Sequence, residues 1–318
     1  MLQKMNFRTQ IPLEKQSKNQ IDYNSNILLI GSCFSDNIGK KLDYFKFQNF
    51  QNPFGILFHP KAIETLITNT IDKKVYTEKD IFFHNEQWHC FDAHSKLSND
   101  SKDDLLSELN SQIQLTHQQI KKSTHIIITL GTAWVYRFKE TNVVVANCHK
   151  VPQKQFAKEL LAVKEIVDSL QAIIDKINQV NSQASIIFTV SPVRHIKDGF
   201  VENMQSKSHL ISAIHQVLNN KLLYFPSYEI MMDELRDYRF YAEDMIHPNQ
   251  TAINYIWDKF HEAWISNTSF KIMQRIEVVQ KGLMHKPFNI KSKQHQIFLT
   301  NLKEKKNQLK KEFPHLKF

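Results

Sequence analysis

The sequence predicts an α/β protein built on an open parallel sheet with helices on both faces. Four largely apolar runs, at residues 27–30, 126–130, 186–190 and 222–225, are too short for helices and are bounded by polar residues. Such runs are typical of strands buried on both faces of a parallel sheet. Longer segments with helical spacing of apolar residues separate them, and strands that alternate with helices are the pattern of this fold class.

The first strand and the helix that follows it, residues 26–42, form the most informative stretch. Gly31 ends the strand, and Ser32 and Cys33 stand where the helix begins. The helix has an inward face because apolar residues recur every four positions, at Phe34, Ile38 and Leu42. A helix N-terminus presents unpaired N–H groups and the positive end of the dipole, which stabilise an anion or a thiolate. We therefore expect a nucleophile in this turn.

The other elements follow in order after a polar, extended lead-in over residues 1–25. Alternation predicts short strands at 45–50, 81–83 and 88–91 and a hairpin of 135–138 with 143–146. Apolar spacing predicts helices at 60–70, 103–122, 158–180, 206–219, 228–235 and 252–264. In open parallel sheets the ligand site forms from residues just past the carboxyl ends of the strands. Those positions hold Ser32, Cys33, Gly55, Gly131, Thr132, Ser191, Arg194 and His195.

Asp244 and His247 form a second chemical signal, on the loop before the last predicted helix. An Asp three residues before a His can accept a hydrogen bond from the ring Nδ1–H and leave Nε2 free as a base. Taken alone, the pair favours a structural role, with Asp244 capping a helix and His247 packing beside Pro248. Taken with a nucleophile early in the chain, it favours catalysis in the order nucleophile, acid, base.

That order and the Asp-x-x-His loop resemble the SGNH (GDSL-type) hydrolases, and the chain more specifically resembles the GSCFA family. The motif of the family name stands here as Gly31-Ser32-Cys33-Phe34-Ser35, with Ser in place of the final Ala. Further landmarks, from about Phe7 to about Trp264, are NPFG (52–55), FDAHS (91–95), GTAW (131–134), NCHK (147–150), SPVRH (191–195) and DYRFY (237–241). The resemblance implies a three-layer, flavodoxin-like sheet.

The resemblance also implies a nucleophile in the Gly31 turn. Laid over this chain by its glycine, the superfamily triplet Gly-Asp-Ser places the nucleophile at Cys33. A register shifted by one makes Ser32 the nucleophile instead, and in the first register Ser32 is a candidate oxyanion donor. A third interpretation is that Cys33 is a small buried packing residue. We favour Cys33, because a helix N-terminus and His247 would both favour its thiolate.

The third superfamily block, Gly-x-Asn-Asp, stands here as Gly131-Thr132-Ala133-Trp134, so its oxyanion Asn is missing. The developing negative charge of acyl transfer still needs hydrogen-bond donors. The expected substitutes are the backbone N–H groups of Cys33 and Gly55, or the side chain of Asn147 beside His149 and Lys150.

One arginine and two histidines are further candidates for ligand binding. Arg194 and His195 are candidates to bind a carboxylate, phosphate or sugar hydroxyl, with an ion pair between Arg194 and Asp198 or Glu202 as the alternative. His94 is assigned to substrate lining. Soft metal ligands occur at His89, Cys90, His94, Cys148 and His149, but no metal-type spacing organises them, so we expect no metal and no cofactor.

Length and composition indicate a soluble protein with one large core. Its 318 residues carry a net charge of +9, and the densest lysine run lies in the tail from Lys281 to Lys317. A solvated helical tail explains that run more simply than a nucleic-acid-binding patch. We therefore expect a domain at residues 1–280 and a basic helical extension at 281–318. The odd number of cysteines, three, favours a reduced compartment, and without a predicted membrane span or secretory signal we expect a cytoplasmic protein.

The sequence therefore predicts an esterase or acyltransferase with a Cys33 (or Ser32), Asp244, His247 triad. The expected substrate is a small acyl ester, such as acetyl, on a hydroxylated or carbohydrate-like small molecule, where the carbohydrate follows by analogy with the superfamily. The competing hypothesis is a non-catalytic binding protein whose cleft uses Arg194, His195 and Lys150 to hold an anionic or sugar ligand.

Overall fold

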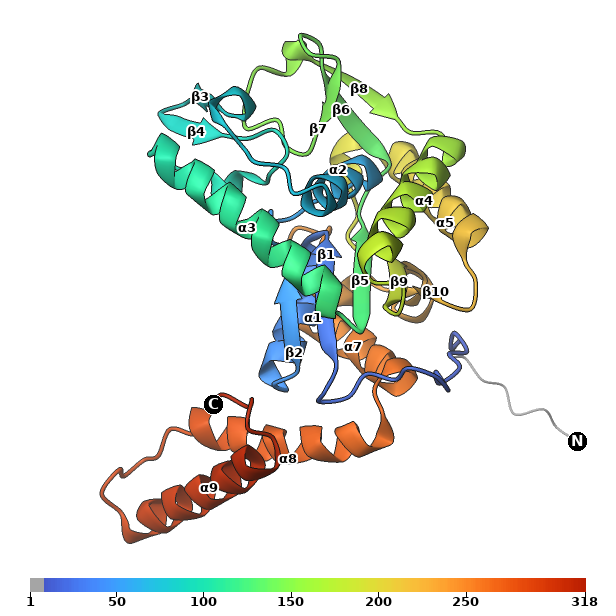
Figure 1. The fold of residues 1–318 in the computed structure, drawn as a ribbon. Helices are drawn as coiled ribbons and strands as arrows, with labels where there is room; N and C mark the ends of the chain where they lie inside the picture. The colour runs from blue at the N-terminus through green and yellow to red at the C-terminus, as the bar shows by residue number, and fades with distance from the viewer. Residues whose placement is uncertain (1–8) are drawn as a thin grey trace, which may run out of the picture.

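The computed structural model describes residues 9–318, and a five-stranded parallel sheet forms its centre (Figure 1). Its strands are β1 (Asn26–Gly31), β2 (Gln48–Gln51), β5 (His125–Leu130), β9 (Ser185–Val190) and β10 (Leu222–Phe225). Their spatial order is β10-β9-β5-β1-β2, and all four neighbouring pairs are parallel. Counted along the chain, this is the flavodoxin-like order 2-1-3-4-5. The predicted fold class is confirmed.

The central strands are buried on both faces, which explains their unbroken apolar runs. In β1, Leu28 and Ile30 belong to one hydrophobic core, and Ile27 and Leu29 belong to the other. Successive side chains of a strand point to opposite faces, so a run of four aliphatic residues feeds both cores equally. The sequence pattern and the packing therefore agree residue by residue.

Helices complete a three-layer arrangement (Figure 1). One face of the sheet packs against α2 (Pro60–Ile71), α3 (Lys102–Lys122), α4 (Val163–Val180) and α5 (Phe200–Val217). The other face packs against α1 (Cys33–Tyr44) and α7 (Gln250–Trp264), and buried residues of α8 (Asn267–Met284) extend the same core. The carboxyl ends of β1 and β5, where the strand order reverses, are left for a site.

Two small antiparallel sheets are inserted at the carboxyl end of the central sheet. One pairs β3 (Phe82–His84) with β4 (Gln87–His89), and the other has the order β7 (Val143–Val145), β6 (Trp134–Phe138), β8 (Phe156–Leu160). The predicted helix at 158–180 is wrong at its start, because residues up to Leu160 pair with β6. α4 begins only at Val163. Its N-cap residue is Ala162, whose N–H donates to the Glu165 carboxylate at 2.7 Å.

Two other boundaries differ from the sequence prediction. α5 begins at Phe200 rather than at residue 206, after Gly199 with φ +119°. The segment predicted as one helix over 228–235 is a short α6 (Ser227–Glu229) followed by a π-helical turn (Ile230–Glu234). The start of the predicted lead-in, and Phe7, where the family resemblance begins, lie outside the described residues.

The chain ends in a helical hairpin of α8 and α9 (Lys293–Glu312). The helices are joined by apolar contacts at Leu302 and Leu309 and by a paired contact of Arg275 with Glu312, both bonds at 2.7 Å. The domain boundary expected after residue 280 stays a prediction; that position falls within α8. Within residues 9–318, none of the helices has the length and hydropathy needed to cross a membrane.

Candidate active site

A cavity of about 400 Å³ opens at the carboxyl ends of β1, β5 and β9. In flavodoxin-like sheets this is the topological switch point, where ligands bind. Its walls come from the β1–α1 turn, the inserted β6–β7 hairpin and the loops after β5, β9 and the 238–247 segment. The predicted site residues in its lining are Cys33, Thr132, Asn147, Arg194, His195 and His247.

The β1–α1 turn places Cys33, and not Ser32, at the cavity. Gly31 has φ +142°, and a Cβ there would lie 2.1 Å from the Thr129 carbonyl oxygen, so the strand can only turn here on glycine. Ser32 is 1% exposed, and its hydroxyl caps α1 by accepting the Phe34 N–H at 3.3 Å. The Ser32 hydroxyl therefore has a structural use, and Cys33 is the nucleophile candidate that reaches the cavity.

The electrostatics of Cys33 differ from the sequence expectation. Burial raises the pKa of the Cys33 thiol, and the Asp36 carboxylate raises it further. Lys207 and the N–H groups of Cys33 and Phe34 act in the opposite direction, but they do not outweigh burial. The helix N-terminus favours the thiolate as expected, yet the net effect keeps the resting group a thiol.

Lys207, which the sequence analysis did not identify, is a buried lysine whose positive charge lowers the pKa of this thiol. It is 1% exposed, and its ammonium donates to the carbonyl oxygens of Gly131 at 2.7 Å and Ser191 at 2.8 Å. Burial lowers the pKa of Lys207 to about 7. A sequence signal existed: Lys207 shares the inward face of α5 with Asn203 and Leu210, where a charged residue is unexpected.

The loop of Asp244 and His247 has the geometry that its spacing predicts. The Asp244 carboxylate accepts the His247 Nδ1–H at 2.6 Å and the backbone N–H groups of Ile246 and His247 at 2.9 and 3.0 Å. The backbone N–H of His247, followed by the His247 ring and the Ile246 N–H, lowers the pKa of Asp244 to about 2. The carboxylate is therefore ionised at neutral pH, and the ring presents Nε2.

Arg194 contacts this loop and also lines the cavity, so its expected binding role stays a prediction. Its Nη2 donates to the Met245 carbonyl at 2.5 Å, its backbone N–H donates to the Ile246 carbonyl at 3.2 Å, and its guanidinium lies 4.7 Å from the Tyr241 ring centroid. Met245 has φ +57°, so the clamp acts on the strained residue of the loop. Asp198, expected as an ion-pair partner of Arg194, pairs with Lys158 at 2.6 Å.

His195 lines the cavity as a neutral ring. Burial, followed by the charges of Lys207 and His247, lowers its pKa to about 3. Its Nε2 is shielded from water and has no hydrogen-bond partner among the described residues. A neutral imidazole can exchange a hydrogen bond with a hydroxyl or carbonyl, but it cannot supply the positive charge that an anionic ligand needs.

Three backbone N–H groups at the predicted site positions already have acceptors within the fold. The N–H groups of Gly131 and Thr132 both donate to the Phe58 carbonyl, at 2.6 and 3.2 Å. The Gly55 N–H donates to the Asn52 carbonyl at 2.8 Å, and Gly55 lies outside the cavity lining, so its predicted oxyanion role is not supported. Asn147 does line the cavity; its Oδ1 accepts the His149 N–H at 2.8 Å, which leaves its NH₂ group as the donor.

Comparison with known proteins identifies the family. The model of the GSCFA family matches residues 26–260, which is most of the chain. The chain belongs to the GSCFA family. A second model, described as the C-terminal domain of GSCFA domain proteins, matches residues 276–318, which cover the end of α8 and all of α9. The family predicted from the Gly31–Ser35 motif is thus confirmed.

The GSCFA chain also matches solved structures at low identity. One is an acetyl esterase mutant with an acetate ion (10% identity, TM-score 0.37), and another is a carbohydrate esterase family 3 protein from Talaromyces cellulolyticus (8% identity, TM-score 0.36). Each match covers 80% of this chain and 99% of the other. No curated protein matches the chain.

Two predicted histidines of the GSCFA landmarks have structural contacts outside the cavity lining. His94 caps a 3-10 turn by accepting the Lys96 N–H at 3.2 Å. His149 is buried, donates from Nε2 to the Cys90 carbonyl at 2.8 Å, and has a pKa lowered to about 4 by burial. His59, which sequence reasoning missed, does line the cavity, but both ring nitrogens are used, on the Ala62 N–H and the Val145 carbonyl.

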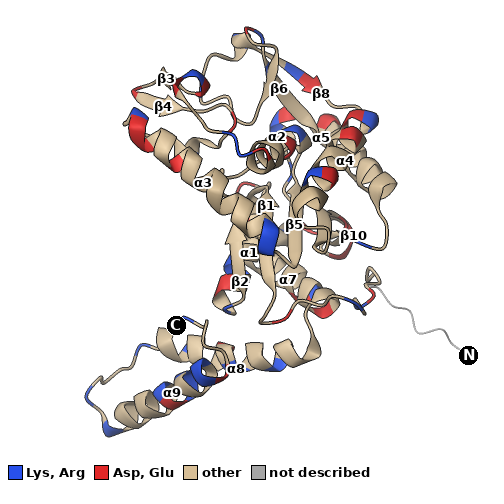
Figure 2. Cartoon of the chain, viewed as in Figure 1, with Lys and Arg blue, Asp and Glu red and all other residues tan. Residues whose placement is uncertain are grey.

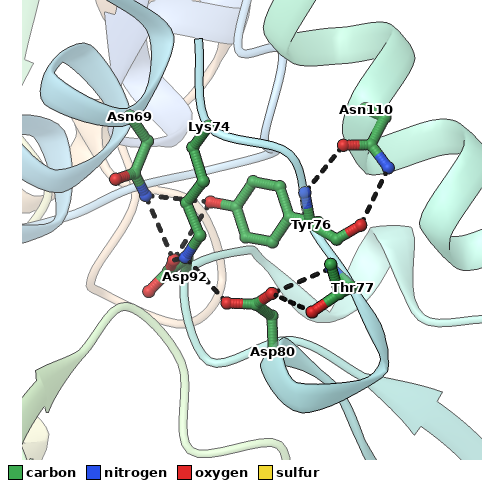
Figure 3. A network of polar contacts seen from close by, with 7 residues as sticks. All are labelled: Asn69, Lys74, Tyr76, Thr77, Asp80, Asp92 and Asn110. Atoms are coloured by element: carbon green, nitrogen blue, oxygen red, sulfur yellow. Dashed lines mark hydrogen bonds and ion pairs between the residues drawn. The ribbon is translucent and has the colours of Figure 1, made fainter. Parts of the chain in front are cut away.

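The landmark Asp92 also has a structural role, in a polar network (Figure 3). Its carboxylate accepts from the Tyr76 hydroxyl at 3.0 Å and from Lys74 and Asn69 at 3.3 Å. These bonds tie the segment after β4 to the end of α2. Within residues 9–318, no three His, Cys, Asp or Glu side chains gather as a metal site would require.

Proposed function

We propose that this GSCFA protein is an SGNH-type acyl-transfer enzyme, an esterase or O-acyltransferase acting on a small acyl ester of a hydroxylated or carbohydrate-like molecule. The observation that carries the proposal is the 2.6 Å contact of Asp244 with His247, beside a cavity that Cys33 also lines. A binding cleft does not need a histidine held by a carboxylate with Nε2 facing the ligand, whereas acyl transfer does.

In this mechanism the Cys33 thiol gives its proton to His247 Nε2 as Sγ attacks the acyl carbonyl carbon. The new C–S bond pushes the carbonyl electrons onto oxygen. When the tetrahedral intermediate collapses, the ester C–O bond breaks and the imidazolium of His247 protonates the leaving alkoxide. Water or a second hydroxyl then attacks the thioester while His247 takes its proton. The C–S bond breaks, and the His247 imidazolium returns that proton to the Cys33 thiolate. Asp244 keeps the ring oriented and stabilises its cation.

The oxyanion donors in this proposal are the Cys33 N–H and the NH₂ group of Asn147. The Cys33 N–H lies at the N-terminus of α1, where the helix dipole also favours negative charge. Asn147 supplies the side-chain amide that the superfamily carries in its third block. This assignment follows from the use of the Gly131, Thr132 and Gly55 amides elsewhere.

The test is p-nitrophenyl acetate turnover together with iodoacetamide labelling of each cysteine. We expect Cys33→Ala and His247→Ala each to lower turnover by about 10³-fold or more. Cys148→Ala is the matched control, because Cys148 lines the same cavity on the β7 side, and we expect it to retain turnover. Turnover that survives in Cys33→Ala would exclude this nucleophile, and loss in Cys148→Ala alone would move the chemistry to the hairpin.

The second candidate function is a binding protein, and two observations favour it: the raised pKa of Cys33 and the occupied amides of Gly131 and Thr132. A sugar fits this alternative better than an anion, because Arg194 is committed to Met245 and His195 is neutral. An acetylated saccharide that binds in calorimetry and remains intact on prolonged incubation would establish it.

A further inference from the structure

The hairpin of α8 and α9 projects from the sheet domain beyond the amino ends of the central strands (Figure 1). Its base is fixed by the buried residues Met273, Ile276 and Val279 and by the Gln280 amide, which donates to the Tyr44 carbonyl at 2.8 Å. The loop that joins the two helices lies at the far end. The catalytic cavity lies at the opposite, carboxyl end of the strands, so whatever the hairpin contacts leaves the cavity open.

The far end of this hairpin, residues 281–299, is called the hairpin tip below. It exposes six large hydrophobic side chains: Leu283 (48%), Met284 (63%), Phe288 (fully), Ile290 (69%), Ile297 (54%) and Leu299 (42%). Single exposed hydrophobic residues are ordinary, but a concentration of them marks an interaction surface. A merely solvated tail explains the lysines of this region, and it does not explain these six residues.

Positive charge surrounds the same residues. Residues 285–318 hold nine lysines and two glutamates, a net +7, so they carry most of the +9 of the whole chain. Lys286, Lys291 and Lys293 flank Phe288 and Ile290 directly and are exposed. Figure 2 shows lysines around the loop and along α9, with few acidic residues among them. The hairpin tip is therefore both apolar and cationic.

We propose that the hairpin tip binds an anionic lipid surface, with Phe288 and Ile290 inserted at the headgroup level and the flanking lysines on the phosphates. Aromatic and aliphatic side chains bordered by lysine are the composition of interfacial membrane segments, and each lysine near an anionic surface adds attraction. The cores of protein–protein interfaces are instead depleted in lysine. Nucleic acid would engage the lysines and could stack on Phe288, but it offers no favourable environment for Ile290, Ile297 or Leu299.

The test is co-sedimentation of the full chain with vesicles of phosphatidylcholine alone and of phosphatidylcholine with 30% phosphatidylglycerol. We expect binding to the anionic vesicles that weakens as salt rises, because the lysine attraction is screened. Phe288→Ser with Ile290→Ser should weaken it by about tenfold or more, since apolar burial at the interface is lost. Lys291→Gln with Lys293→Gln should weaken binding to the anionic vesicles and leave any binding to phosphatidylcholine vesicles unchanged.

The matched control is Val75→Ser with Phe83→Ser, which removes two exposed hydrophobic side chains, 69% and 58% exposed, from the inserted end of the molecule. Binding should be unchanged. The proposal is overturned if the anionic vesicles do not sediment the chain, or if the two serine pairs weaken binding equally. It is also overturned if the chain binds single-stranded DNA and Phe288→Ser with Ile290→Ser leaves vesicle binding unchanged. A third contrary outcome is that this serine pair changes only self-association, as measured by sedimentation velocity.

Discussion

Replacing Lys207 by Met tests whether burial lowers the pKa of this lysine, whose charge acts on the Cys33 thiol. In the folded chain the ammonium contacts two neutral carbonyl oxygens, of Gly131 and Ser191, and burial lowers its pKa to about 7. In the unfolded chain a lysine has a pKa near 10.4. Between these two values the unfolded chain holds one more proton than the folded chain at this residue.

The sign and size of the effect follow from proton linkage. The unfolded chain binds more protons in this range, so it is favoured as pH falls. The free energy of unfolding therefore decreases as pH drops from about 10 to about 7, and this residue causes no further decrease below that. The slope is about 1.4 kcal/mol per pH unit, and the gap between the two pKa values amounts to about 5 kcal/mol in all. Lys207→Met removes this slope. It also leaves two buried carbonyls without a donor, at about 1–3 kcal/mol each.

The assay is urea unfolding of the wild type and of Lys207→Met at pH 7, 8 and 9. The difference in free energy of unfolding between the two proteins should change by about 1.4 kcal/mol per pH unit, because all other titrating groups are common to both. The control is Lys164→Met, at a lysine whose side chain is 83% exposed, and it should follow the wild type. Parallel pH dependences of wild type and Lys207→Met would refute the lowered pKa of Lys207, because the lysine would then be equally protonated in the folded and the unfolded chain.

Two further substitutions test the loop and the turn. Asp244→Asn should lower turnover by about 10²- to 10⁴-fold at neutral pH, because an amide no longer holds the His247 tautomer, while Asp168→Asn, at an exposed carboxylate, retains turnover; equal rates in both would exclude an orienting role. Gly31→Ala should destabilise the fold by about 3 kcal/mol or more in urea unfolding, since the new Cβ meets the Thr129 backbone. Gly39→Ala meets only the flexible end of Gln51 and should be nearly neutral; similar losses in both would contradict the argument.

Much of the fold could be predicted because its strands and helices are locally encoded. The runs at 27–30 and 126–130 are apolar at every position since both faces of β1 and β5 are buried, and that pattern is visible without neighbours. β8 was missed because its five residues alternate weakly and lead into a strongly amphipathic helix. β8 pairs with β6, which lies in a separate segment of the sequence, so no local pattern predicts this pairing.

The candidate site divides in the same way. The Asp244 and His247 pair could be predicted because both residues lie on one turn, where spacing alone sets the distance. The role of Arg194 could not, because its partner Met245 lies on another loop, 51 residues away. Lys207 reaches two strand ends from a helix, which only packing brings about.

The sequence by itself determined the strands of the central sheet, the turn at Gly31, the Asp-x-x-His loop and the family, since each depends on patterns of residues a few positions apart. The tertiary structure decided which donors remain for chemistry. Phe58 accepts the amides of Gly131 and Thr132 because its loop folds over β5, and Ser32 is buried where Cys33 reaches the cavity. A hydrogen-bond donor can serve a substrate only if no neighbour has taken it, and neighbours are set by the fold.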